Sequence, residues 1–289
     1  MKRERIEYAI GTSRLAAVLA AALSLAGTFQ NGFYRDNAFV KSVWLGNDIV
    51  TWALAIPLLF YGLHGVHASM RKRRDVAGWP LLRLFLWLGG LWYLIYNYVF
   101  YVYGAAFSGF FLGQVLVVAL SVIALLQALT SAPIHALVAT HLSPPRAPKR
   151  VQSFLLIFAG LLGAAWIVMA GSYWVTGEVP EAIRQTGHPT GVVFATDLLF
   201  LVLPLFSLSV LLRRGERWAW LFVPILLVKC SLYPVVFVVA GITSWLAAGT
   251  YDVLTPAYLL MGIGSAWTLT RFRVEGADRH EGADSQRKL

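Results

Sequence analysis

The sequence has one cysteine, few charged residues and none of the common motifs of soluble enzymes. A single cysteine, Cys230, cannot form an internal disulfide, so cysteine usage carries no information about the redox compartment. Only 13% of the 289 residues are charged, about half of the roughly 25% that is usual in soluble domains. A P-loop, a Gly-x-Ser-x-Gly nucleophile motif and a dinucleotide-binding fingerprint are also absent, so no motif assigns a reaction.

Long apolar runs take the place of these features, and 58% of the residues are hydrophobic. Several runs reach about 20 residues, which is enough for a helix to cross roughly 30 Å of hydrocarbon. The runs do not alternate in polarity as β-barrel strands do. We therefore predict an all-α membrane protein, whose partner is the lipid bilayer, with about eight transmembrane helices at 14–33, 44–64, 81–104, 109–130, 151–173, 192–212, 218–241 and 253–270.

Basic residues are concentrated in alternate connections between these helices. Lys2, Arg3 and Arg5 precede the first helix, and further basic clusters occur at 71–74, 146–150, 213–217 and 271–273. The opposite connections hold only Arg35, Lys41 and Arg184. This asymmetry places both termini in the cytoplasm and explains the net charge of +10 without nucleic-acid binding.

The N-terminal segment has the basic start and apolar stretch of a signal peptide. We expect it instead to be retained as the first transmembrane helix, because the predicted topology requires it. A proline-rich cytoplasmic linker at 142–150, "LSPPRAPKR", separates two four-helix membrane units at 1–141 and 151–271. The polar tail at 272–289, which contains EGAD twice, is expected to be disordered.

The two four-helix units resemble each other. The second and sixth helices each carry an acid near the outer end, Asp48 and Asp197, followed by a Leu-x-x-Pro-Leu pattern. The segment "IYNYVFYVYG" (95–104) matches "LYPVVFVVAG" (232–241) at five of ten positions. Chance similarity between apolar segments is the alternative. Four helices per unit return the chain to its starting side, so the sequence predicts two parallel repeats related by an axis along the membrane normal.

An ionisable residue, Lys229, lies near the middle of the seventh predicted helix, in "PILLVKCSLYPVV". At 1.5 Å per residue it is about 17 Å from the cytoplasmic end of that helix. Charged residues inside a span are costly and commonly functional. We predict that Lys229 pairs with Asp197 from the sixth helix. The pair could be a purely structural ion pair, or it could contact a substrate or a proton.

Other polar and aromatic residues share the inner faces of the predicted helices. Tyr233 follows Lys229 by one helical turn, and Gln114 enters from the outer side. The candidate substrate-binding residues are Lys229, Asp197, Tyr233, Tyr96, Asn97, Tyr93, Gln114 and Asp48. Simpler roles stay open: Asp48 as a helix cap, Asn97 as an interhelical hydrogen-bonding residue and the tyrosines as packing residues.

The histidines suggest a weaker alternative site on the cytoplasmic side. His64 and His67 are three residues apart, and His135 and His141 lie on the same side. Such a pair could hold a metal or haem, but no cysteine pair or HExxH motif accompanies it. We therefore predict neither metal ligands nor catalytic residues, and the sequence assigns no cofactor and no oligomeric state.

Three segments, "GNDIVTWALAIPLLFYGL", "LWYLIYNYVFYVYGAAF" and "LLVKCSLYPVV", resemble a group of bacterial multi-pass membrane proteins of unknown function. The resemblance extends over most of the chain and implies a location in the bacterial cytoplasmic (inner) membrane. The leading hypothesis is a transporter or binding protein for a small molecule or ion. The alternatives are a membrane-embedded enzyme acting on a lipid or quinone-like substrate, and an accessory subunit whose polar residues serve only helix packing.

Overall fold

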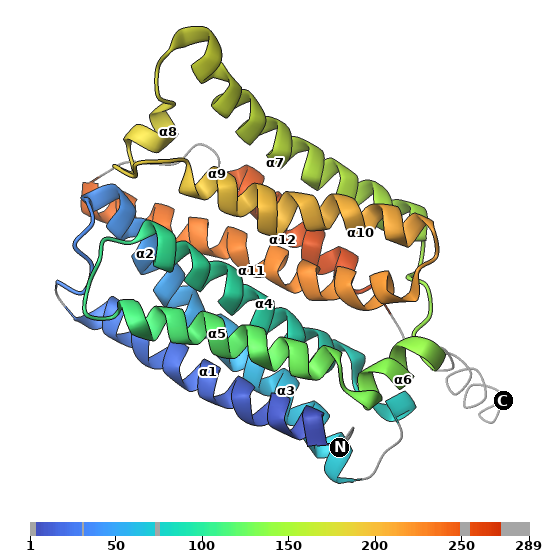
Figure 1. The fold of residues 1–289 in the computed structure, drawn as a ribbon. Coiled ribbons are helices and arrows are strands. Elements are labelled where there is room, and N and C mark those ends of the chain that lie inside the picture. The colour runs from blue at the N-terminus through green and yellow to red at the C-terminus, as the bar shows by residue number, and fades with distance from the viewer. Residues whose placement is uncertain (1–3, 31, 73–75, 249–254, 273–289) are drawn as a thin grey trace.

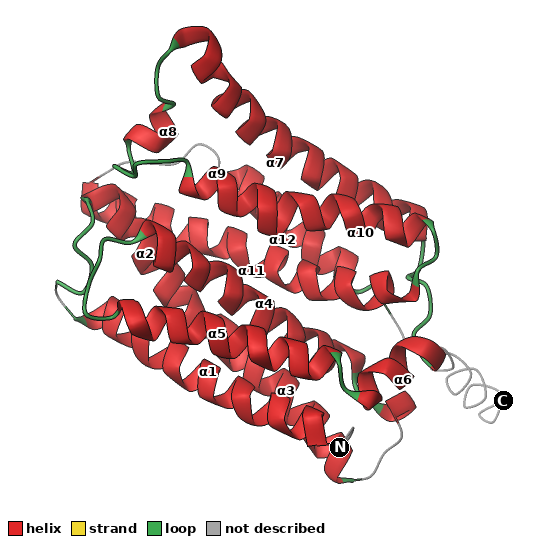
Figure 2. Ribbon diagram, viewed as in Figure 1, coloured by secondary structure: helices red, strands yellow, loops and turns green. Residues whose placement is uncertain are grey.

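The computed structural model describes residues 4–30, 32–72, 76–248 and 255–272, and within these ranges the chain is helical with no β-strand (Figures 1 and 2). The helices of the first half are α1 (Glu4–Phe29), α2 (Ala38–Val50), η1 (Thr51–Ala55), α3 (Ile56–Arg71), η2 (Val76–Gly78), α4 (Leu81–Gly104), α5 (Phe111–Leu129) and α6 (Ala132–Thr140). Those of the second half are α7 (Pro148–Thr176), α8 (Glu181–Arg184), α9 (Val192–Asp197), η3 (Leu198–Val202), α10 (Leu203–Arg213), α11 (Arg217–Ala248) and α12 (Thr255–Leu269).

Seven helical segments in the described residues are long and apolar enough to cross a bilayer, which defines a multi-pass membrane protein. Two of them are composite: α2, η1 and α3 run as one segment, and so do α9, η3 and α10. The predicted limits 81–104 coincide with those of α4. The eighth predicted helix corresponds to α12, which has only 15 residues.

Several predicted boundaries were wrong: three helices begin earlier than predicted, and two continue past the predicted ends at 64 and 241, to Arg71 and Ala248. The first helix begins at Glu4 rather than 14, and α7 begins at Pro148, inside the predicted linker. The second helix begins at Ala38 rather than 44, because the Asn37 side chain accepts a hydrogen bond from the backbone N–H of Val40 at 2.9 Å and caps it there. Asp48 therefore lies well inside α2 and is not a helix cap. The predicted tail beyond 272 lies outside the described residues.

Two helices form the centre of the bundle (Figure 1). In their most apolar stretches, 78% of the residues of α4 and 61% of those of α11 are buried within the protein, against 22% for α7. The peripheral helices turn large apolar side chains outwards, including Leu116 of α5 and Val168 of α7. An apolar exterior around a core that contains buried polar groups suits a protein surrounded by lipid tails.

Both composite spans contain a π-helical turn at the same distance from a proline. The N–H of Ile56 donates to the carbonyl of Thr51, and the N–H of Leu203 donates to that of Leu198. Each donor directly precedes a proline, Pro57 or Pro204. Proline has no N–H and its ring clashes with the carbonyl four residues earlier, so a wider turn accommodates it. The π-turns follow soon after Asp48 and Asp197.

Small residues allow the central helices to approach closely. A Cβ atom at Gly46 of α2 would lie 2.8 Å from the carbonyl oxygen of Val236 in α11. One at Gly89 of α4 would lie 2.5 Å from the Cβ of Val228. Both α2 and α4 therefore pack tightly against α11, and this three-helix junction holds the buried polar residues described below.

Candidate binding site around Lys229

Lys229 is completely buried and is held by aromatic rings. Its Nζ lies 3.5 Å from the ring centroid of Tyr96, on α4, and 4.0 Å from that of Tyr233, one turn along α11. The two rings meet edge to face, with centroids 5.0 Å apart. A desolvated cation–π contact contributes about 2 kcal/mol. Among the residues that the structure describes, none accepts a hydrogen bond from the Nζ atom, so the ammonium group has no acceptor oxygen from them.

Asp197 lies beside this arrangement at the end of α9. The Tyr96 hydroxyl donates to its Oδ1, and the indole Nε1 of Trp166, from α7, donates to its Oδ2 at 2.9 Å. The carboxyl group is 3% exposed. Two hydrogen bonds to a buried carboxylate stabilise its ionised form and orient it.

The predicted direct ion pair between Asp197 and Lys229 is not formed. Tyr96 lies between them, with its ring face against the ammonium and its hydroxyl on the carboxyl group. The two charges still interact electrostatically. The sequence placed both residues in the interior, but it did not predict that one tyrosine would connect them.

Two asparagines on α2 and α4 add unpartnered polar groups to the same junction. The Tyr93 and Thr51 hydroxyls are 3.1 Å apart, and Asn97 and Asn47 each lie four residues further towards the same end of these antiparallel helices. They therefore occupy the same level. Both side chains are 0% exposed. The Asn97 amide lies close to the Tyr93 hydroxyl, but within the described ranges neither asparagine has a hydrogen-bond partner on its side-chain nitrogen or oxygen.

Unpartnered groups of this kind are unusual. More than about 90% of buried polar groups in proteins are hydrogen-bonded to protein or ordered water. Among the described residues, an ammonium group on α11 and two complete amides, on α2 and α4, lack hydrogen-bond partners. The arrangement can supply donors and acceptors to a polar guest molecule.

Two predicted site residues are not brought to Lys229. Asp48 faces away, towards α1: Tyr34 of the α1–α2 connection and Tyr101 of α4 donate hydrogen bonds to it. Gln114 is buried at the start of α5, which packs against α1 and α4 rather than α11. The helical periodicity identified the inward faces. It did not predict which side of α2 carries Asp48, or which helices α5 packs against.

Two residues that belong to the site were missed by sequence reasoning. Trp166 was treated as part of an apolar span, although its indole N–H requires a partner when it is buried. Asn47, which lies within the second predicted helix, was not among the candidate residues. A polar side chain inside a span, immediately before an acid, was the signal that could have identified it.

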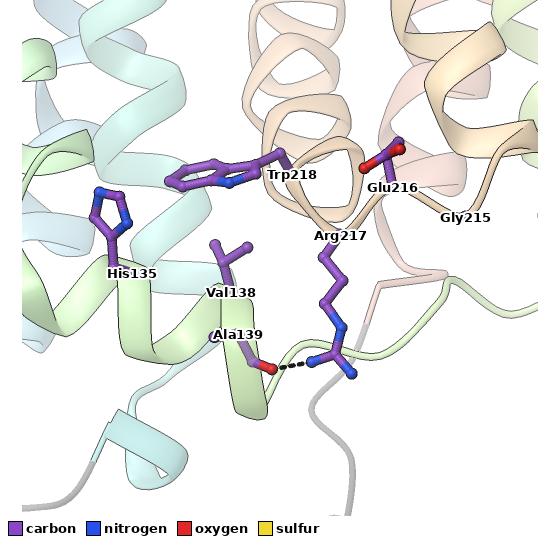
Figure 3. A pocket seen from close by; sticks show the side chains of 7 residues that line it. All are labelled: His135, Val138, Ala139, Gly215, Glu216, Arg217 and Trp218. Atoms are coloured by element: carbon purple, nitrogen blue, oxygen red, sulfur yellow. Dashed lines mark hydrogen bonds between the residues drawn. The ribbon is translucent and has the colours of Figure 1, made fainter.

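In the described part of the chain, no group of three or more histidine, cysteine, aspartate or glutamate residues is placed to bind a metal ion. His67 Nδ1 lies 3.1 Å from a guanidinium nitrogen of Arg14. His135 faces the edge of Trp218, with ring centroids 5.2 Å apart, in the pocket drawn in Figure 3.

That pocket has a volume of about 320 Å³ and lies between α6 and the start of α11. Arg217 crosses it and donates to the backbone carbonyl of Ala139 (Figure 3). Lys229 is twelve residues further along α11, which corresponds to about 18 Å. The pocket is therefore separate from the buried site.

Comparisons with protein-family models, curated proteins and solved structures found no match to this chain. The architecture places it among multi-pass helical membrane proteins. Because a fold does not by itself imply a function, the activity has to be argued from the site.

Proposed function

We propose that the chain is a transporter or binding protein for a small anion, or for a small molecule with an anionic group, which binds at Lys229. The supporting observation is a fully buried ammonium group that has no acceptor oxygen from any residue in the described part of the chain. Keeping such a charge dehydrated is costly, and the cost falls when hydrogen-bond acceptors complete its surroundings. An anionic ligand supplies those acceptors where the protein does not.

The unpartnered amides favour a ligand with a second polar group. Asn47 and Asn97 each offer an amide donor and a carbonyl acceptor at the junction that also holds Lys229. A small carboxylate that also carries a hydroxyl or amino group would match both the ammonium and the amides. This chemistry would leave fewer buried groups unsatisfied in the bound state than in the empty one.

Access from the outer side would require an aromatic stack to open. Phe194 stacks on Trp166 with ring centroids 4.5 Å apart, and Trp166 is bonded to Asp197. Phe194 also lines a small cavity of about 10 Å³ near His188. Separating the Phe194 and Trp166 rings would connect the outer surface to Asp197, so we propose that this stack closes the outer entrance.

We further propose that the chain consists of two parallel four-helix repeats, with α12 as the eighth transmembrane helix. The π-turns before Pro57 and Pro204 support this arrangement, because they occupy equivalent positions. Tyr96 and Tyr233, which align in the proposed repeat, contact each other. Contact between equivalent residues is expected at a two-fold axis.

The orientation is proposed from the distribution of charge. The backbone N–H of Arg146, just before α7, donates to the carbonyl of Arg271, just after α12, at 2.8 Å, so these two basic connections lie at the same end of the bundle. That end also includes the N-terminus of α1 (Figure 1). The positive-inside rule then supports cytoplasmic termini, and we propose the bacterial inner membrane as the location.

A ligand screen on the full-length protein in lipid nanodiscs tests the proposed function. Small carboxylates, phosphate and sulfate would be screened by thermal unfolding of the wild type, Lys229→Met and the matched control Lys149→Met, whose side chain is exposed. A ligand at 100 times its Kd stabilises by about 2.7 kcal/mol. We expect at least one anion to stabilise the wild type and the control but not Lys229→Met.

Uptake of that anion into proteoliposomes would then distinguish a transporter from a binding protein. Equal stabilisation of Lys229→Met and the wild type would show that the anion binds elsewhere, and the proposed site would be wrong. If no anion stabilises the wild type while Lys229→Met remains folded, the accessory-subunit hypothesis is favoured.

A further inference from the structure

The second buried acid, Asp48, has no role in the site around Lys229. Its carboxyl group is 1% exposed, and both of its oxygens accept hydrogen bonds from tyrosine hydroxyls. Tyr34 donates to Oδ2 at 2.7 Å and Tyr101 donates to Oδ1 at 2.8 Å. On the α1 side the carboxyl group lies so close to Gly27 that a Cβ atom there would be 2.0 Å from Oδ2.

No cation balances this carboxyl group among the residues that the structure describes. The groups that face it are neutral: Ser24 from α1, Tyr98 and Tyr101 from α4, and Tyr34 from the outer connection. At Gly46 the face of α2 towards α11 packs against Val236 and Ala240, which are apolar. Charged residues occur further along the outer connection, at Arg35 and Asp36, and Asp36 accepts from the backbone N–H of Ala106 at 2.9 Å. Asp197, by contrast, has Lys229 nearby.

The hydrogen-bonding partners of Asp48 can serve both of its protonation states. A hydroxyl donates to an ionised carboxylate and can also accept from a protonated carboxyl group, because it carries both a donor hydrogen and lone pairs. A fixed cation would have favoured only the ionised state. The two tyrosines therefore form a site in which a proton can bind or leave without loss of the hydrogen-bonded arrangement.

Tyr34 connects this site to the outer surface. It belongs to the connection between α1 and α2 and is only half-buried, whereas Tyr101 is buried within α4. The Tyr34 and Tyr101 rings stack with centroids 5.9 Å apart. Burial, and then the nearby charge of Asp48, raise the pKa of Tyr34 well above its usual range, so its hydroxyl keeps its proton at neutral pH.

We propose that Asp48 is a proton-binding site that exchanges with the outer aqueous phase through Tyr34. The bound species is a proton, and the site is distinct from the anion site around Lys229. Asp48 directly follows Asn47 on α2 and precedes the π-turn at Thr51–Ala55. A change of charge at Asp48 therefore acts on the helix that carries one of the unpartnered amides.

Infrared spectroscopy of the full-length protein in nanodiscs tests this proposal directly. The carbonyl stretch of a protonated carboxylic acid is well separated from the carboxylate bands, and it would be followed from mildly acidic to mildly alkaline pH. We expect a reversible, pH-dependent carboxylic-acid band in the wild type that is lost in Asp48→Asn. The band should persist in Lys229→Met, so failure of the anion-site proposal would not remove it.

Two further variants keep the test decisive if Asp48→Asn does not fold. Tyr34→Phe and Tyr101→Phe each remove one hydroxyl but keep the ring, and each should shift the midpoint of the band, because hydroxyl donors favour the ionised form. The proposal is overturned if the wild type shows no titrating carboxylic-acid band, if the band survives in a folded Asp48→Asn protein, or if neither tyrosine variant shifts its midpoint.

Discussion

Replacing Lys229 or Asp197 should change the free energy of unfolding by different amounts, because Tyr96 contacts the two residues in different ways. We consider Lys229→Met, Asp197→Leu and the double variant. Among the described residues, Lys229 makes two cation–π contacts and no hydrogen bond. Asp197 accepts two hydrogen bonds, from Tyr96 and Trp166. The two residues are therefore expected to respond differently to replacement, although both are buried charges.

The magnitudes follow from these contacts. Lys229→Met loses two desolvated cation–π contacts, about 4 kcal/mol together. It also leaves Asp197 without a nearby positive charge, but it removes the cost of keeping an ammonium group dehydrated, which is several kcal/mol. These effects nearly cancel, so we expect a net change within about 2 kcal/mol in either direction. Asp197→Leu leaves two donors and the lysine charge uncompensated, so it should destabilise by about 3–5 kcal/mol.

The double variant tests most directly whether the two charges are energetically coupled. Lys229→Met introduced into Asp197→Leu removes the uncompensated charge, so it should recover about 1–3 kcal/mol of the lost stability. The free energy of unfolding would be measured by SDS titration in mixed micelles, with Lys149→Met as the control. Additive effects within about 0.5 kcal/mol would show that the two charges are not coupled and would refute this reasoning.

Three further predictions concern packing and ionisation elsewhere in the bundle. Gly46→Ala should destabilise the protein by about 1–3 kcal/mol, because the new Cβ would lie 2.8 Å from a backbone oxygen. Gly11→Ala is the control and should not destabilise, because no atom lies within 4 Å of its Cβ position. SDS titration checks both variants. Trp87→Phe should cost about 1–3 kcal/mol, measured in the same way, because it leaves the buried Ser13 hydroxyl without the indole donor at 2.9 Å. The raised pKa of Tyr34 favours its neutral form in the folded protein, so its contribution should be complete below pH of about 10 and decline as the pH rises further. Tyr34→Phe should therefore weaken the alkaline loss of thermal stability, and an unchanged pH profile would contradict this prediction.

The class of the protein could be predicted from the sequence because membrane insertion depends mainly on local composition. An apolar run of about 20 residues can satisfy its backbone hydrogen bonds within its own helix, so its state does not depend on distant residues. The all-helical structure and the limits of the third helix, 81–104, were confirmed for this reason. The second helix was predicted to begin too late, because the cap at Asn37 lies outside the apolar run.

The side chains that contact each other in the site come from distant parts of the chain, so the sequence of one segment could not predict these contacts. Periodicity placed Lys229, Tyr96 and Tyr233 on inward faces, and they do meet. The hydrogen bond from Trp166 to Asp197 joins α7 to α9 and could not be read from either segment alone.

The sequence by itself determined that this chain crosses a membrane and that Lys229 lies within a span. Only the tertiary structure decided that Tyr96 separates Lys229 from Asp197, and that Asp48 faces two tyrosines on the other side of α2. The physical reason is that hydrophobicity and helical periodicity specify the depth and face of a side chain. The close packing of helices from different parts of the chain then selects which side chains touch.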